Sequence, residues 1–274
     1  DLNMDAEQPK VHFTVGLNDD VTHLSIPDVP LAVDSEGIVN CKFWGFGSDG
    51  TVGANKNSIK IIGDNTDMFV QAYFEYDTKK SGGVTKSHLR FGKNPIRATY
   101  YIKEADFLAC HKPVYMSTYD IVGEVRDGGV FLLNCSWTPE ELETHLSNKV
   151  KRQIAQKKIR FYTIDASKIA REIGLGSNRT NTVLQAAFFK LANIMPIEDA
   201  VEHMKKAIYK TYMAKGDKIV SMNQAAVDRG VDGIVKIDVP AAWAELPEEA
   251  VQEDTRNIPD FIKKIVEPSN LDRK

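Results

Sequence analysis

Glycines and small polar side chains interrupt an apolar run between Lys42 and Lys56, in the sequence KFWGFGSDGTVGANK. The apolar residues before the glycines are typical of a buried strand, and the pattern after them is typical of a helix. Glycine lets the backbone turn tightly and approach a ligand, and the free N–H groups at the start of a helix attract anions. The stretch therefore predicts a phosphate-binding turn between a strand and a helix. The candidate ligand-contacting residues in it are Gly47, Ser48, Asp49, Gly50, Thr51, Asn55 and Lys56.

The same glycines admit more than one interpretation. Gly45, Gly47 and Gly50 fit GxGxxG, the fingerprint of dinucleotide-binding proteins, and Asp77 lies roughly where a ribose-binding acid is expected. Two lysines follow Asp77 at once, which suits an additional phosphate better than a bare ribose diol. A Walker-type loop is excluded because no Gly-Lys-Ser/Thr closes the turn. A glycine turn that only joins a strand to a helix is the third interpretation.

Two other stretches combine glycines with groups that bind anions. KKSGGVTKSHLR, from Lys79 to Arg90, carries cations and hydroxyl groups, and a solvated basic hairpin is its alternative interpretation. GLGSNRTN precedes a long amphipathic helix that Asn178, Thr180 and Asn181 can cap. Arg179 offers a planar fork for a phosphate or carboxylate. The candidates from the two stretches are Lys79, Lys80, Ser81, Arg179 and Asn181.

Strand and helix patterns alternate from the glycines onward, and they must position these residues. The predicted elements are helix 53–65, strand 70–77, strand 107–110, helix 114–122, strand 129–135, helix 139–158 and strand 160–165, followed by a mostly helical region over 167–237. Such alternation predicts an α/β, Rossmann-like fold: a mostly parallel sheet with crossover helices and a helix-rich C-terminal half. Ligands of such sheets bind beyond the carboxyl ends of the strands, where the glycine turn falls.

Three runs are more specific than the general motif: FWGFGSDGTVGANKNSIKIIG, YFEYDTKKSGGVTKSHLRFG and GLGSNRTNTVLQAAFF. With them the chain resembles, over nearly its whole length, the third domain of pyruvate:ferredoxin (flavodoxin) oxidoreductases, the counterpart of the gamma subunit of multi-subunit 2-oxoacid oxidoreductases. The resemblance implies a parent enzyme that decarboxylates pyruvate on thiamine diphosphate, passes electrons through 4Fe–4S clusters to ferredoxin or flavodoxin, and transfers the acetyl group to coenzyme A. For this domain it implies coenzyme A binding.

The resemblance also implies that the catalytic centre lies elsewhere. Thiamine diphosphate, Mg²⁺ and the clusters belong to other domains of the same polypeptide, so this domain is expected to be inactive alone and to hold no catalytic residue. A homodimeric parent is expected. His88 is assigned to turn structure and not to a catalytic base, because the proton chemistry of such enzymes belongs to thiamine. The alternatives are an NAD(P)-dependent dehydrogenase that uses GFGSDG and Asp77, and a structural interaction domain without a ligand.

Composition narrows the class of protein. The chain has 274 residues, of which 42% are hydrophobic and 27% charged, with a net charge of −3. This composition is typical of a globular domain, and the charge argues against a nucleic-acid-binding protein. No stretch approaches the roughly 20 apolar residues of a membrane-spanning helix, so no membrane partner is expected. The sequence begins DLNMDAEQ without an initiating methionine, which suits a piece of a longer polypeptide.

The three cysteines, Cys41, Cys110 and Cys135, are widely separated and form no CxxC pair. An iron–sulfur cluster needs four thiolates and a structural zinc needs four ligands, so neither is expected in this chain. Each cysteine lies in or beside an apolar run, which predicts buried, reduced thiols. A reducing compartment follows: the cytoplasm, or an organelle of an anaerobic eukaryote.

The chain is expected to have three parts. Residues 1–40 form a connector, with strand-like alternation at Val11, Phe13 and Val15. Residues 41–238 form the gamma-type domain. Residues 239–274 are acidic and contain four prolines, which predicts an interdomain arm whose Trp243 is exposed and docks on a neighbouring domain.

Overall fold

The computed structural model describes residues 11–17, 20–27, 37–78, 82–248 and 258–266. The chain divides into two compact units, Asp1–Glu36 and Gly37–Lys274. In the described residues of the first unit, one bridge joins Val15 to Ile26. Val11 and Phe13 are exposed and belong to no strand, so the strand-like alternation of this segment yields a single bridge at Val15.

The second unit is built on a seven-stranded sheet of order β2-β3-β1-β4-β5-β6-β7. Its strands are β1 (Ile38–Phe46), β2 (Phe69–Tyr76), β3 (Val84–Gly92), β4 (Ala105–Cys110), β5 (Val125–Asn134), β6 (Arg160–Ile164) and β7 (Val235–Lys236). The four central strands, β1, β4, β5 and β6, are parallel. β3 lies between β2 and β1 and is antiparallel to both, and β7 is antiparallel to β6. The predicted α/β class with a parallel centre is confirmed, whereas β3 was missed.

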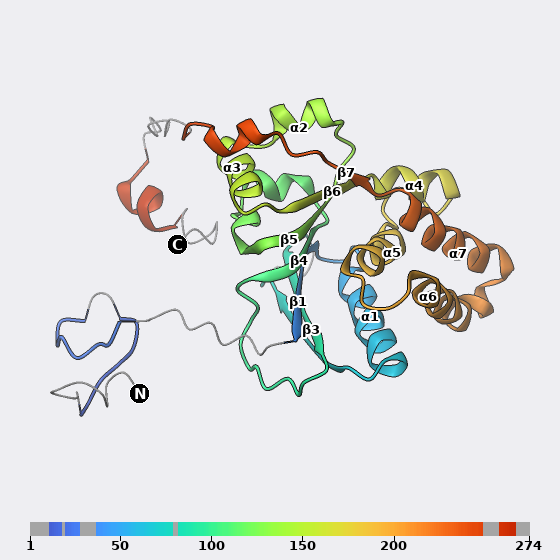
Figure 1. Cartoon of the computed structure of the whole chain (residues 1–274), viewed down its shortest axis with the longest axis horizontal. Helices are drawn as coiled ribbons and strands as arrows, with labels where there is room; N and C mark the ends of the chain where they lie inside the picture. The colour runs from blue at the N-terminus through green and yellow to red at the C-terminus, as the bar shows by residue number, and fades with distance from the viewer. Residues whose placement is uncertain (1–10, 18–19, 28–36, 79–81, 249–257, 267–274) are drawn as a thin grey trace. The chain divides into compact units, whose positions relative to one another are not determined.

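Helices cover both faces of this sheet (Figure 1). They are α1 (Thr51–Asn65), α2 (Pro139–His145), α3 (Asn148–Gln156), α4 (Ala166–Ile173), α5 (Asn181–Ala192), α6 (Ile197–Tyr212) and α7 (Asp217–Asp232), with short helical turns η1 (Pro113–Ser117), η2 (Val122–Glu124), η3 (Met213–Lys215), η4 (Ala241–Glu245) and η5 (Ile262–Val266). The helices α1 and α4–α7 lie on one face, and α2, α3 and η1 lie on the other. The predicted crossover helices and the helix-rich C-terminal half are confirmed.

The helix predicted over 139–158 is two helices. Ser147 interrupts it with an extended backbone, and its hydroxyl accepts a hydrogen bond from the N–H of Val150 at 3.3 Å. A serine that caps a helix start in this way offers the backbone an alternative to a continuous helix. The chain therefore turns at Ser147, and α3 begins in a new direction.

The helix predicted over 114–122 is replaced by the short turns η1 and η2. The hydroxyls of Ser117 and Thr118 both donate to the carbonyl of Val114, at 2.9 and 3.2 Å. Side-chain bonds of this kind compete with the regular ladder of an α-helix. Tyr115, Met116, Ile121 and Val122 of the segment are buried, whereas Val114 is exposed, so most of its contribution to the core was predicted and its backbone was not.

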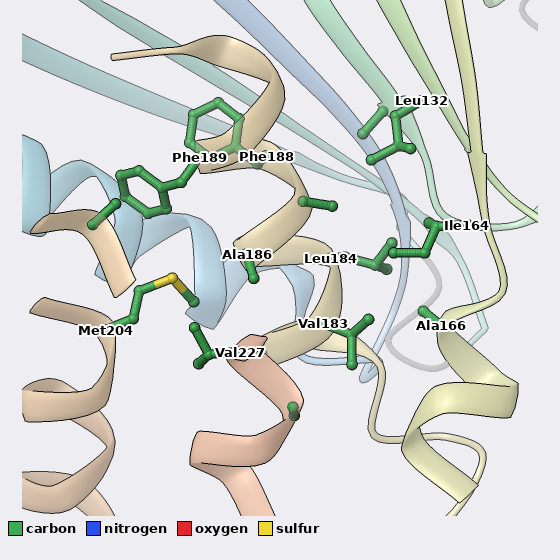
Figure 2. Close-up of a cluster of buried hydrophobic side chains, with 14 of the residues drawn as sticks. Leu132, Ile164, Ala166, Val183, Leu184, Ala186, Phe188, Phe189, Met204 and Val227 are labelled. Atoms are coloured by element: carbon green, nitrogen blue, oxygen red, sulfur yellow. The ribbon is translucent and has the colours of Figure 1, made fainter. Parts of the chain in front are cut away.

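The main core lies between the sheet and the helices α4–α7. Figure 2 shows Phe188 and Phe189 of α5 near Met204 of α6 and Val227 of α7, and all four side chains are buried. The ring of Phe188 packs edge-on against Phe43 of β1, with ring centroids 5.0 Å apart. This packing holds the end of β1, and the glycines that follow it, against the helical layer.

The opposite core contains Trp243, which is only 3% exposed. Its indole N–H donates to the carboxylate of Glu143 at 2.6 Å, and η4 packs beside α3. The expectation of an exposed tryptophan is therefore wrong. The acidic residues around Trp243 led to the expectation of exposure. A tryptophan is nevertheless buried readily when its N–H finds a hydrogen-bond partner.

The three cysteines are buried free thiols, as predicted. Burial raises the pKa of Cys110 to about 12, and that of Cys135 to about 11. They are therefore thiols rather than thiolates near neutral pH. Among the described helices, none is long and apolar enough to cross a membrane.

Candidate ligand site at the glycine loop

The glycine loop joins the end of β1 to the start of α1, and its own aspartate closes it. The carboxylate of Asp49 accepts hydrogen bonds from the N–H groups of Phe46, at 2.9 Å, and Thr51, at 2.8 Å. Ser48 and Gly50 have positive φ angles, 74° and 87°. The N–H group of Thr51, at the start of α1, was predicted to be free for a phosphate. In the structure it is bonded to Asp49 instead.

A cavity of about 580 Å³ opens beside this loop. Its walls come from the loop, the end of β2 and the start of β3. The lining residues are Phe46, Gly47, Ser48, Asp49, Gly50, Val52, Tyr76, Asp77, Gly83, Val84 and Thr85. The structure therefore brings four of the predicted contact residues, Gly47 to Gly50, to the surface of one cavity.

β3 lies between the glycine loop, which follows β1, and Asp77, which follows β2. The N–H of Gly47 donates to the carbonyl of Gly83 at 2.8 Å, and the N–H of Asp77 donates to the carbonyl of Val84 at 3.0 Å. A Cβ atom on Gly47 would lie only 3.3 Å from that carbonyl oxygen of Gly83, which explains the glycine at this close approach. In the dinucleotide fold, the strand that carries the ribose-binding acid belongs to a parallel βαβ unit. Here an antiparallel strand intervenes between β1 and β2.

The stretch 174–181 meets the glycine loop through Asn181. A Cβ atom on Gly50 would lie 3.2 Å from Nδ2 of Asn181, so the starts of α1 and α5 are side by side. Thr180 is the residue before α5, but its side chain forms no capping hydrogen bond. Arg179 is exposed and does not line the cavity.

The other predicted contact residues lie apart from the cavity or outside the described residues. Asn55 is buried on the inner face of α1, and Lys56 is exposed, with its ammonium 5.4 Å from the ring of Phe74. Neither lines the cavity. Lys79, Lys80 and Ser81 lie outside the described residues.

Sequence reasoning missed His111, which follows β4. The Oγ1 atom of Thr51 lies 2.7 Å from Nδ1 of His111, and both side chains are buried. Burial lowers the pKa of His111 to about 4, despite the opposing charge of Asp49. The imidazole is therefore neutral near pH 7. The available signal was a polar residue directly after an apolar strand, which is the carboxyl end of a predicted parallel strand.

His111 lies where the connections change sides of the sheet. After β1 the chain covers one face with α1, and after β4 it covers the other face with η1. The carbonyl of His111 accepts a hydrogen bond from Nδ2 of Asn134, at the end of β5, at 3.0 Å. The ends of three parallel strands are thus connected at the switch point where α/β sheets commonly bind ligands.

His88 is in the middle of β3, so its assignment to a turn is wrong. It is 1% exposed, its Nε2 lies 2.5 Å from a carboxylate oxygen of Glu75, and its Nδ1 accepts from the N–H of Ile102 at 3.1 Å. Burial lowers the pKa of His88. The alternative interpretation of this stretch, a solvated basic hairpin, is wrong from Val84 onward, where the chain forms an interior strand of the sheet. Within the described ranges, no three His, Cys, Asp or Glu side chains form a group that could hold a metal ion.

A parallel-centred sheet covered on both faces, with a cavity at its carboxyl edge, places the chain among the α/β proteins. A family model described as pyruvate ferredoxin/flavodoxin oxidoreductase matches residues 40–233. The pyruvate:ferredoxin oxidoreductase of Moorella thermoacetica is 53% identical over 270 residues, which are 98% of this chain and 23% of that protein. The chain belongs to the pyruvate ferredoxin/flavodoxin oxidoreductase family, and it spans about a quarter of the length of this relative.

Two solved structures share the fold at low sequence identity. Pyruvate oxidoreductase subunit PORC of Thermotoga maritima aligns with a TM-score of 0.59 and 17% identity, over 74% of this chain and all of that chain. A 2-oxoglutarate:ferredoxin oxidoreductase of Magnetococcus marinus, described with 2-oxoglutarate, coenzyme A and succinyl-CoA bound, aligns with a TM-score of 0.54 and 16% identity, over 79% of this chain and 33% of that one.

Proposed function

We propose that this chain is the coenzyme A-binding domain of a pyruvate:ferredoxin or pyruvate:flavodoxin oxidoreductase. The parent enzyme oxidatively decarboxylates pyruvate to acetyl-CoA and passes the electrons to ferredoxin or flavodoxin. The observation that carries the proposal is the cavity of about 580 Å³ at the glycine loop, in a chain of this family. Cavities of roughly 300 to 1,000 Å³ are typical of small-molecule sites.

The charges of coenzyme A suit the cations that the sequence places near the lining residues in the chain. Its pyrophosphate and 3′-phosphate carry more negative charge than one helix start can neutralise. The chain between the lining residues Asp77 and Gly83 contains Lys79 and Lys80, and Arg179 precedes α5 by two residues. Charge-assisted contacts from these groups would supply the remainder of the binding.

Two other functions receive less support. A dinucleotide-dependent dehydrogenase would use the loop and Asp77, but the strand between them departs from the dinucleotide fold. A structural interaction domain would need no cavity at the carboxyl edge. The cavity and the position of the loop at the switch point both favour a ligand.

Calorimetric titration of the purified chain with coenzyme A, NAD and NADP tests the proposal. Coenzyme A is expected to bind, and NAD and NADP to bind at least tenfold more weakly. Circular dichroism before and after titration confirms that the chain is folded. Preferred binding of NAD or NADP would support the dehydrogenase. A folded chain that binds none of the three would support the structural domain.

The remaining chemistry is assigned to other parts of the parent enzyme. Thiamine diphosphate, Mg²⁺ and the 4Fe–4S clusters are held by other domains of the same polypeptide, in a parent that is a homodimer. The chain alone is expected to be colourless and to show no pyruvate-dependent reduction of ferredoxin or flavodoxin. Cluster absorbance in the purified chain would contradict this division of roles.

A further inference from the structure

β2 lies at one edge of the sheet, and its outer side pairs with no other described strand. Edge strands are usually short, bulged, covered, or supplied with lysine or proline, because their free N–H and C=O groups otherwise pair with another strand. β2 has eight residues, pairs with β3 in unbroken register, and contains neither lysine nor proline. Its one charged residue, Glu75, is held by His88 of β3. β2 therefore has the properties of a strand that pairs with a further strand in the assembled protein.

Exposed aromatic side chains accompany this edge. On β2 they are Phe69, Tyr73 and Tyr76, which are 50%, 40% and 61% exposed. Tyr101, also half exposed, packs edge-on against Tyr73 with ring centroids 6.2 Å apart, and it stacks on the buried ring of His88 at 4.8 Å. Side chains held in this way lose little conformational entropy when a partner covers them. Exposed, ordered tyrosines are typical of the centre of a protein–protein interface.

The sequence of β2 is complementary to itself. When two copies meet about a two-fold axis that passes through Tyr73, perpendicular to the sheet, the two strands run antiparallel. Residues equally distant from Tyr73 then lie opposite each other on the same face. The opposed pairs are Tyr73–Tyr73, Ala72–Phe74, Gln71–Glu75 and Val70–Tyr76. Three of these pairs are apolar or aromatic, which stabilises a sheet, and no like charges lie opposite each other.

We propose that this edge is an interface between two copies of the chain, formed by antiparallel pairing of β2 with its own copy about Tyr73. The pairing joins two seven-stranded sheets into one and leaves no open edge at β2. A two-fold contact also closes on itself, so it produces a dimer and not a filament. A strand from another part of the parent polypeptide is the competing occupant, and the self-complementary sequence favours a second copy. The inference goes beyond the proposed coenzyme site and does not depend on it.

Analytical ultracentrifugation of the 274-residue chain over a range of micromolar concentrations measures the assembly. The wild type should form a reversible dimer and no larger species. Tyr73→Lys places two lysines against each other at the two-fold axis, and like charges directly opposite each other are destabilising. This change should therefore raise the dissociation constant of the dimer at least about tenfold. Tyr209→Lys is the matched control, because Tyr209 is a 52% exposed tyrosine of α6 and not of the sheet, and it should leave the dimer unchanged.

A cysteine placed at the axis tests the register. Tyr73→Cys should form a disulfide-linked dimer under mild oxidation, because directly opposite residues of antiparallel strands lie within reach of a disulfide. Val70→Cys should not, because its own copy lies six residues along the partner strand, roughly 20 Å away. The natural cysteines, Cys41, Cys110 and Cys135, are buried and should form no link between copies. Linkage through position 70 in preference to position 73 overturns the proposed pairing.

Two further outcomes decide against the inference. A folded wild type that stays a monomer overturns it and leaves the edge of β2 to another part of the parent polypeptide. A dimer that Tyr73→Lys leaves intact overturns it as well, because the contact between copies then lies elsewhere. Circular dichroism and the melting temperature of each variant distinguish loss of the dimer from loss of the fold, and if Tyr73→Lys unfolds the chain, the two cysteine variants decide.

Discussion

Oγ1 of Thr51 lies 2.7 Å from Nδ1 of His111, and this buried contact joins the first residue of α1 to the residue that follows β4. The N–H of Thr51 is held at the same time by Asp49. Thr51 is therefore fixed through both its backbone and its side chain. Because the glycine loop ends at Thr51, the contact with His111 sets the position of one cavity wall.

Thr51→Val should reduce the free energy of unfolding by about 1 to 3 kcal/mol, because it leaves Nδ1 of His111 buried without a partner. A double-mutant cycle with His111→Leu, measured by urea denaturation, isolates the interaction between the two side chains. The cycle should give a favourable coupling energy. Ser117→Ala, which removes an exposed hydroxyl at the end of η1, is the control and should change stability by less than about 0.5 kcal/mol. Additive effects of Thr51→Val and His111→Leu would show that the contact contributes nothing.

The stability of the chain should fall as the pH drops from about 6.5 towards 4. Burial lowers the pKa of His111 in the folded chain to about 4, whereas an unfolded histidine titrates near 6.5, so only the unfolded state gains a proton in this range. This histidine contributes at most about 1.4 kcal/mol per pH unit. His88 contributes in the same direction, because burial lowers its pKa as well.

Urea denaturation of the wild type and His111→Asn between pH 7 and pH 4 measures how much of this pH dependence of stability comes from His111. The amide of asparagine can still bond to Thr51 but does not titrate, so the variant should lose less stability as the pH falls. Parallel curves for the two proteins would show that His111 titrates normally in the folded state.

Gly50 and Gly53 should respond oppositely to alanine. Gly50 has a φ angle of +87°, and an added Cβ would lie 3.2 Å from Nδ2 of Asn181, so Gly50→Ala should destabilise the chain by about 1 to 3 kcal/mol. Gly53 lies within α1 with no atom within 4 Å of an added Cβ, so Gly53→Ala should stabilise by roughly 0.5 to 1 kcal/mol. Thermal or urea denaturation of both variants measures the difference. Equal effects would show that Gly50 is not strained.

Trp243 should contribute to the stability of this chain by itself. Trp243→Ala removes a fully packed side chain beside α3 and should cost about 3 to 5 kcal/mol. Trp243→Phe keeps most of the packing but loses the hydrogen bond to Glu143, and should cost roughly 1 to 3 kcal/mol. Unfolding followed by circular dichroism measures both. An alanine variant as stable as the wild type would indicate that Trp243 docks elsewhere.

The lysines that follow Asp77 should contribute to coenzyme A binding in a salt-dependent way. The double change Lys79→Ala with Lys80→Ala should weaken coenzyme A at least about tenfold at low salt, since charge-assisted contacts contribute about 1.5 to 3 kcal/mol each. The loss should shrink as salt rises, because salt screens the wild-type contacts. Lys206→Ala, which breaks an exposed pair with Glu202 on α6, is the charge control. An equal salt response in all variants would exclude a phosphate contact.

Local patterns predicted the elements that carry the glycine loop. The apolar run before Gly47 and the helical pattern after Gly53 predicted β1 and α1 because periodicity is a property of neighbouring residues. The parallel strands of the centre and the helices of the C-terminal half were predicted for the same reason, and the three cysteines were correctly expected to be buried.

The sequence by itself determined the central parallel strands, most of the helices, the family and the loop. Tertiary structure alone decided that β3 lies between β2 and β1, that His111 meets Thr51, that Asn181 lies against Gly50 and that Trp243 is buried. Each of these depends on residues far apart in the chain. Strand pairing and burial set such contacts, and they leave no periodic trace in the local sequence.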